Sequence, residues 1–65
     1  MSFTIGTALL DARDHKFAVE LLVEGHWITG QVAAVDGFGV VLSREETQHS
    51  VIRIESIAAI LPSSR

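Results

Sequence analysis

From residue 17 onward, the hydrophobic residues occur in five short segments that turn-forming residues separate. These segments are 17–23, 27–35, 38–43, 48–54 and 57–61. The breaks between them are Glu24-Gly25, Asp36-Gly37, 44–47 and Glu55-Ser56, and Pro62 ends the last segment. Short runs of β-forming residues bounded by turn signals are typical of strands. The sequence therefore predicts a mainly β chain with five strands.

The segment that precedes these strands, 3–15, has a different pattern. Ile5 and Leu9 stand at helical offsets, and Thr4 or Thr7 can cap the start of a helix. We therefore expect one short helix before the first strand.

Gly30 lies inside the second predicted strand. An interior glycine weakens a strand, so it usually marks a sharp bend, a bulge or a close approach of another backbone. A sheet of five short strands with such a bend forms a small, strongly curved open barrel. We predict a single domain, 1–65, with an N-terminal helix region at 1–16 and the barrel at 17–65.

An open barrel leaves two edge strands with unpaired backbone groups. The chain has 65 residues, 48% of them hydrophobic, and no cysteine, so a disulfide cannot stabilise its small core. The last two predicted strands are apolar on both faces, which indicates that a second copy covers them. We expect a closed homo-oligomeric ring of about five to seven copies; the alternative is a monomer with apolar edges. The predicted subunit-interface residues are Val51, Ile52, Ile57, Ala59 and Ile60.

Charge and composition exclude several classes of function. A net charge of −3 argues against a broad basic face for duplex DNA, and the chain lacks an apolar run long enough to span a membrane. The first residues do not have the pattern of a signal peptide, so a cytoplasmic location is expected. His15, His26 and His49 are too scattered for a metal site. With neither a nucleophile arrangement nor a phosphate-binding loop, we expect no cofactor and no enzymatic activity.

Two signatures in the sequence resemble those of the Sm/Lsm/Hfq superfamily. The first signature has the pattern L-x2-G-x4-G-x-h-x2-h-D, where x is any residue and h is an apolar residue. It is matched by Leu22, Gly25, Gly30, Val32, Val35 and Asp36. The second signature is approached by residues 51–57, and the tail 60–65 is similar to the end of the bacterial Hfq core. The resemblance covers residues 17–65.

This resemblance implies an SH3-like Sm fold and a ring in which the fourth strand of one copy pairs with the fifth strand of the next. It also implies binding of single-stranded RNA near the central pore. By the family pattern Asp36 braces one loop, Phe38 offers a stacking surface and Arg53 contacts the base or a phosphate. Val40 stands where many Sm proteins have a uracil-reading asparagine, so the resemblance does not extend to uracil reading.

Other interpretations of these residues stay open from the sequence. Asp36 can simply hold its own turn, Phe38 can belong to the core, and Arg53 can pair with Glu55. The neighbouring residues His26 and Trp27 form a possible second binding surface, or Trp27 packs against the helix or the barrel. The alternative function is a ring-shaped scaffold or protein-interaction module of the same fold that does not bind RNA.

Overall fold

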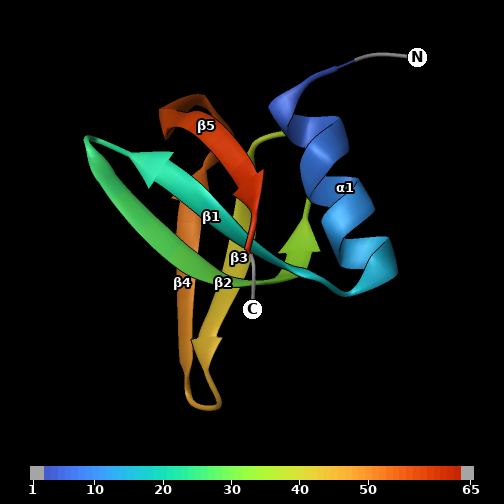
Figure 1. Cartoon of the computed structure of the whole chain (residues 1–65), viewed down its shortest axis with the longest axis vertical. Coiled ribbons are helices and arrows are strands. Elements are labelled where there is room, and N and C mark those ends of the chain that lie inside the picture. Colours follow the sequence, from blue (N-terminus) through green and yellow to red (C-terminus); the bar gives the residue numbers. More distant parts are fainter. Residues whose placement is uncertain (1–2, 64–65) are drawn as a thin grey trace.

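The computed structural model describes residues 3–63 as one helix and five antiparallel strands in a single sheet (Figure 1). The ends of the predicted domain, residues 1–2 and 64–65, lie outside the described residues, and so do the last two positions of the Hfq-like tail. The elements, in order, are α1 Ile5–His15, β1 Ala18–Val23, β2 His26–Val35, β3 Gly39–Glu45, β4 Gln48–Arg53, the 3-10 turn η1 Ile54–Ser56 and β5 Ile57–Pro62.

Helix α1 begins where its threonines form a reciprocal cap. Thr4 Oγ1 accepts a hydrogen bond from the Thr7 backbone N–H at 3.0 Å, and Thr7 Oγ1 accepts one from the Thr4 N–H at 3.1 Å. This arrangement satisfies two donors that the first helical turn leaves unpaired. Of the two candidate caps, Thr4 is therefore the N-cap, and Phe3 lies before the helix rather than inside it. The helix ends at His15, and its C-cap residue Lys16 adopts the left-handed conformation (φ 60°).

The strand order is β4-β3-β2-β1-β5, so β4 and β5 are the two edges of a sheet that does not close. This confirms the predicted fold: a mainly β chain with a short N-terminal helix and five strands. The two edge strands follow one another in the chain and are joined only by η1. Each therefore has one side without a strand partner within residues 3–63.

The sheet bends at β2, which pairs with two different strands along its length. Its first half pairs with β1, its second half pairs with β3, and Gln31 pairs with both Ala18 and Ser43. In Figure 1, β2 curves through much of the sheet. A Cβ atom on Gly30 would lie 2.7 Å from the Ser43 carbonyl oxygen and 2.8 Å from Leu42 Cγ. Of the three meanings that an interior glycine can have, Gly30 therefore marks a close backbone approach.

Six strand ends differ from the prediction by one or two residues, and three of the differences have a clear physical reason or bear on the site. Strand β3 continues to Glu45, because the turn contains only Glu46 and Thr47 instead of the four predicted residues 44–47. The pairing of β3 with β4 shifts register between Ser43 and Glu45. Pro62 is the last residue of β5 instead of the residue beyond it. An edge strand accepts proline because half of its N–H groups need no ladder partner. Phe38 precedes β3 instead of opening it.

The core is formed by buried residues of α1 and of all five strands, and α1 packs against β2 and β5. No polar side chain within residues 3–63 is buried. The buried residues are Leu9, Ala12, Val19, Leu21, Val32, Val40, Leu42, Ile52 and Ile57. Two of the predicted interface residues, Ile52 and Ile57, are thus part of the chain's own core. Their side chains point inward, while the backbones of β4 and β5 remain at the sheet edges.

Candidate nucleic-acid interface

Asp36 braces the turn that joins β2 to β3. Its Oδ1 atom accepts hydrogen bonds from the backbone N–H groups of Phe38 at 2.7 Å and Gly39 at 2.9 Å. The Asp36 N–H in turn donates to the Gly39 carbonyl oxygen at 3.0 Å. The hydrogen bonds from Phe38 and then from Gly39 stabilise the carboxylate and lower the pKa of Asp36 below its ordinary value. Asp36 therefore holds the turn, a role that both interpretations of this residue share.

Phe38 projects from this turn with 87% of its surface exposed. The core interpretation of Phe38 is wrong. Val40 and Leu42 point inward from β3, but the strand alternation does not reach position 38, because that residue lies in the Asp36 turn. The Phe38 carbonyl oxygen accepts a hydrogen bond from the Ile54 N–H at 2.9 Å. This bond ties the β2–β3 turn to the start of η1, so that two loops distant in sequence meet.

Arg53 stands beside this junction at the end of β4, opposite Gly39 in the neighbouring strand. Its Nη2 atom donates to Glu55 Oε1, and both side chains are exposed. The pairing between Arg53 and Glu55 that the sequence left open is therefore present. It places a cation and an anion side by side next to Phe38.

These loops enclose a shallow pocket of about 400 Å³. It is lined by Gly37, Phe38, Arg53, Ile54 and Glu55. The structure thus brings Phe38 and Arg53 together, while Asp36 supports the pocket without lining it. The predicted RNA-binding residues did not include Ile54 or Glu55, and Glu55 entered the sequence analysis as a possible partner of Arg53. The two-residue spacing from Arg53 to Glu55 across a turn is the signal that could have found Glu55.

His26 and Trp27 lie at the opposite end of β2 from the Asp36 turn. Both are exposed, Trp27 to 48%, and Trp27 is paired with Leu22 across the β1–β2 hairpin. That hairpin turns through Glu24 and Gly25, both with positive φ, which suits the right-handed twist of the strands. The predicted second surface is therefore separate from the Phe38 pocket.

The remaining interface candidates lie on the edge strands. Val51 is 79% exposed on the outer side of β4, next to the exposed residues His49 and Arg53 on the same side. Ala59 and Ile60 on β5 are partly buried. The outer face of β4 is therefore mixed in polarity. The expectation that β4 is apolar on both faces is wrong.

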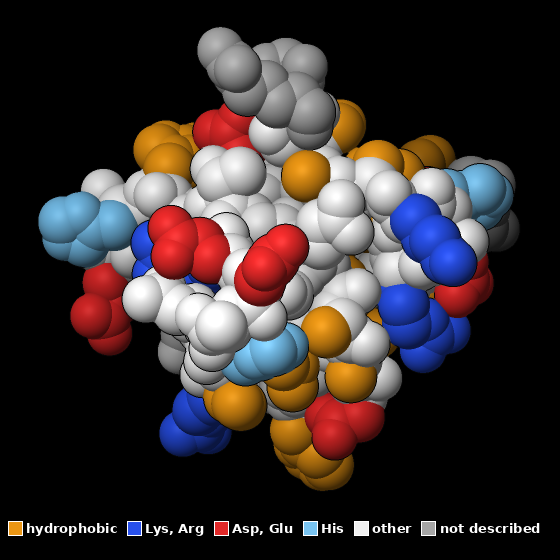
Figure 2. Space-filling model, turned by 90° about the horizontal axis from the view of Figure 1, so that it is seen from below, with side chains coloured by type: hydrophobic (Ala, Val, Ile, Leu, Met, Phe, Trp, Pro, Cys, Tyr) orange, Lys and Arg blue, Asp and Glu red, His pale blue; other side chains and the backbone are white. Residues whose placement is uncertain are grey.

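Charged side chains of both signs are distributed over the surface. Figure 2 shows acidic and basic groups interspersed on one face, with hydrophobic patches between them. Within residues 3–63, no group of three or more His, Asp or Glu side chains could hold a metal ion. No helix in the same range is long and apolar enough to cross a membrane.

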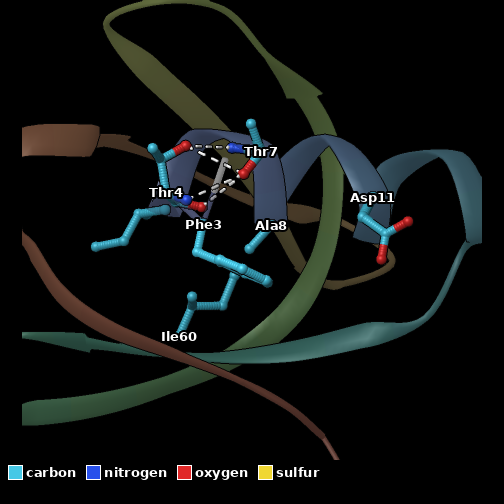
Figure 3. A pocket seen from close by; sticks show the side chains of 7 residues that line it. Phe3, Thr4, Thr7, Ala8, Asp11 and Ile60 are labelled. Carbon is cyan, nitrogen blue, oxygen red and sulfur yellow. Dashed lines mark hydrogen bonds between the residues drawn. The ribbon is translucent and has the colours of Figure 1, made fainter. Parts of the chain in front are cut away.

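A second and larger pocket, of about 620 Å³, lies between the start of α1 and β5. In Figure 3 the side chains of Phe3 and Ala8 face the same space as Ile60 from β5. Phe3 itself is 92% exposed. Sequence reasoning did not predict this pocket, because it depends on how the helix start is placed against an edge strand.

Comparison with known proteins does not assign this chain: no protein-family model matches it, and no curated protein matches its sequence.

Proposed function

We propose that this chain is a subunit of an Sm-like, cytoplasmic homo-oligomeric ring that binds single-stranded RNA by stacking bases on Phe38. The observation that carries this proposal is the position of Phe38. A large aromatic side chain is exposed to solvent on a turn held by three hydrogen bonds and lies beside an arginine. Stacking of a base on an aromatic ring contributes about 1–3 kcal/mol and tolerates different sequences.

Ring formation is supported by the two open edges. Among residues 3–63, strands β4 and β5 each have one side without a strand partner, and antiparallel pairing of β4 with β5 of the next copy satisfies both. Such a contact also places a neighbouring strand beside Val51, which is exposed in the single chain. A ring repeats the Phe38 pocket once per copy, so an RNA strand that touches several pockets gains avidity from weak individual contacts.

The test is fluorescence anisotropy at low salt with short labelled oligouridine, oligoadenine and a guanine-containing strand. We expect Phe38→Ala and Arg53→Ala to weaken binding by about tenfold or more, since each removes a contact of roughly 1–3 kcal/mol. Phe3→Ala is the matched control, because it removes an equally exposed phenylalanine from the other pocket. Absence of binding by the unmodified protein at tens of micromolar, or equal losses in Phe38→Ala and Phe3→Ala, contradicts the proposal.

One observation favours the alternative of a protein scaffold. Arg53 is already paired with Glu55, so its charge is compensated in a chain of net charge −3. In a scaffold, Phe38 contacts another protein and the ring carries no RNA. Assembly without any oligonucleotide binding is the result that supports this second function.

A further inference from the structure

Within residues 3–63, the ion pair beside Phe38 has hydrogen-bonding capacity that no other group uses. A guanidinium carries five N–H donors, and a carboxylate accepts through two oxygens. Only the bond from Arg53 Nη2 to Glu55 Oε1 joins these two side chains, and both remain exposed at the pocket. The pocket therefore offers, next to an aromatic surface, a donor followed by two acceptors.

This pattern can be compared with the base edges that a single strand exposes. Guanine presents an acceptor, O6, followed by two adjacent donors, N1–H and N2–H2. Uracil has one donor between two carbonyl oxygens, and adenine and cytosine each have one amino donor beside a ring-nitrogen acceptor. When both oxygens of a carboxylate face the base, they are repelled by the second carbonyl oxygen of uracil and by the ring-nitrogen acceptor of adenine or cytosine. Guanine alone matches a donor followed by two acceptors.

We infer that the Phe38 pocket selects guanine in single-stranded RNA. The base stacks on Phe38, Glu55 accepts from N1–H and N2–H2, and Arg53 donates to O6. This inference rests on the proposed RNA binding and specifies its ligand. Glu55 also disfavours a phosphate near Arg53, because the two anions compete for one guanidinium. The site therefore takes up a base in preference to the RNA backbone.

The experiment compares three labelled hexamers: UUGUUG, the same sequence with inosine in place of guanine, and an all-uridine strand. Inosine differs from guanine only by the missing N2 amino group. We expect the guanine strand to bind about tenfold more tightly than the inosine strand, the lower end of the effect of one hydrogen bond to a charged group, because this site is exposed.

The variant Glu55→Gln separates base reading from simple charge. It keeps the size of the side chain, removes one acceptor and removes the repulsion toward phosphate. We expect it to abolish the difference between the guanine and inosine strands and to bind all-uridine RNA more tightly. Glu46→Gln is the matched control, because it makes the same change of charge at the far end of the β3–β4 hairpin. It should leave the ratio of guanine to inosine affinity unchanged.

Two results overturn the inference while leaving the proposed function in place. One is equal affinity for guanine and inosine strands in a protein whose binding still depends on Phe38. The other is a Glu55→Gln variant that tightens all three strands by the same factor, which assigns Glu55 an electrostatic role alone. Failure of all three strands to bind removes both the proposed function and the inference.

Discussion

The substitution Gly30→Ala tests the bend on which the barrel depends. A Cβ atom at this position would lie 2.7 Å from the Ser43 carbonyl oxygen and 2.8 Å from Leu42 Cγ, closer than real Cβ contacts allow. The first of these atoms belongs to the backbone of β3 and cannot move away as a side-chain end does. Strands β2 and β3 must therefore separate where β2 passes from one partner to the next.

We expect this separation to cost about 1–3 kcal/mol, the usual penalty for inserting a methyl group into packed structure. The total stability of a domain this size is on the order of 3–10 kcal/mol. Urea unfolding followed by the fluorescence of Trp27, the single tryptophan, measures the change. The midpoint should fall clearly, and the variant should expose more of its core at intermediate urea concentrations.

Gly37→Ala is the matched control, because nothing lies within 4 Å of a Cβ at that position. Its unfolding midpoint should stay close to that of the unmodified protein. If Gly30→Ala is as stable as Gly37→Ala, the close approach of β3 to Gly30 does not exist and the account of the bend is wrong.

Two further predictions concern the Asp36 turn and the sheet edge. Because its hydrogen bonds lower the folded-state pKa of Asp36, this carboxylate stabilises the fold above its ordinary pKa of 3.8 and loses that effect as the pH falls below 3.8 toward the folded-state value. Between neutral pH and a pH below 3.8, the urea midpoint should therefore fall less for Asp36→Ala than for the unmodified protein. An equal fall in the two proteins contradicts this prediction. Ala59→Glu places a charge on edge strand β5 and should dissociate the proposed ring and lower the melting temperature. A variant that keeps the mass of the unmodified protein contradicts the proposal that β5 forms the subunit contact.

Local signals in the sequence were sufficient for the architecture. The turn dipeptides and Gly30 reflect backbone requirements at single positions, so the five strands and the bend in β2 could be predicted from the residues themselves. Strand ends were less certain, since the length of β3 depends on a register shift near Glu45 that only the pairing with β4 reveals.

The candidate site was less predictable, because its geometry comes from loops that meet in space. Phe38 follows a turn and opens an apolar segment, a pattern that fits a core residue as well as an exposed one. The Phe38 N–H donates to Asp36 Oδ1 within the turn. The bond that decides the matter is the one the Phe38 carbonyl oxygen accepts from the N–H of Ile54, a residue far along the chain. The pocket between Phe3 and Ile60 likewise depends on packing of α1 against β5.

The central claim, a ring that holds RNA at Phe38, is tested most directly by sedimentation of the protein with a labelled guanine-containing hexamer. The account predicts that the label sediments with a single species of about five to seven copies of the 7.0 kDa chain. A protein that sediments at 7.0 kDa, with the label remaining free, contradicts it.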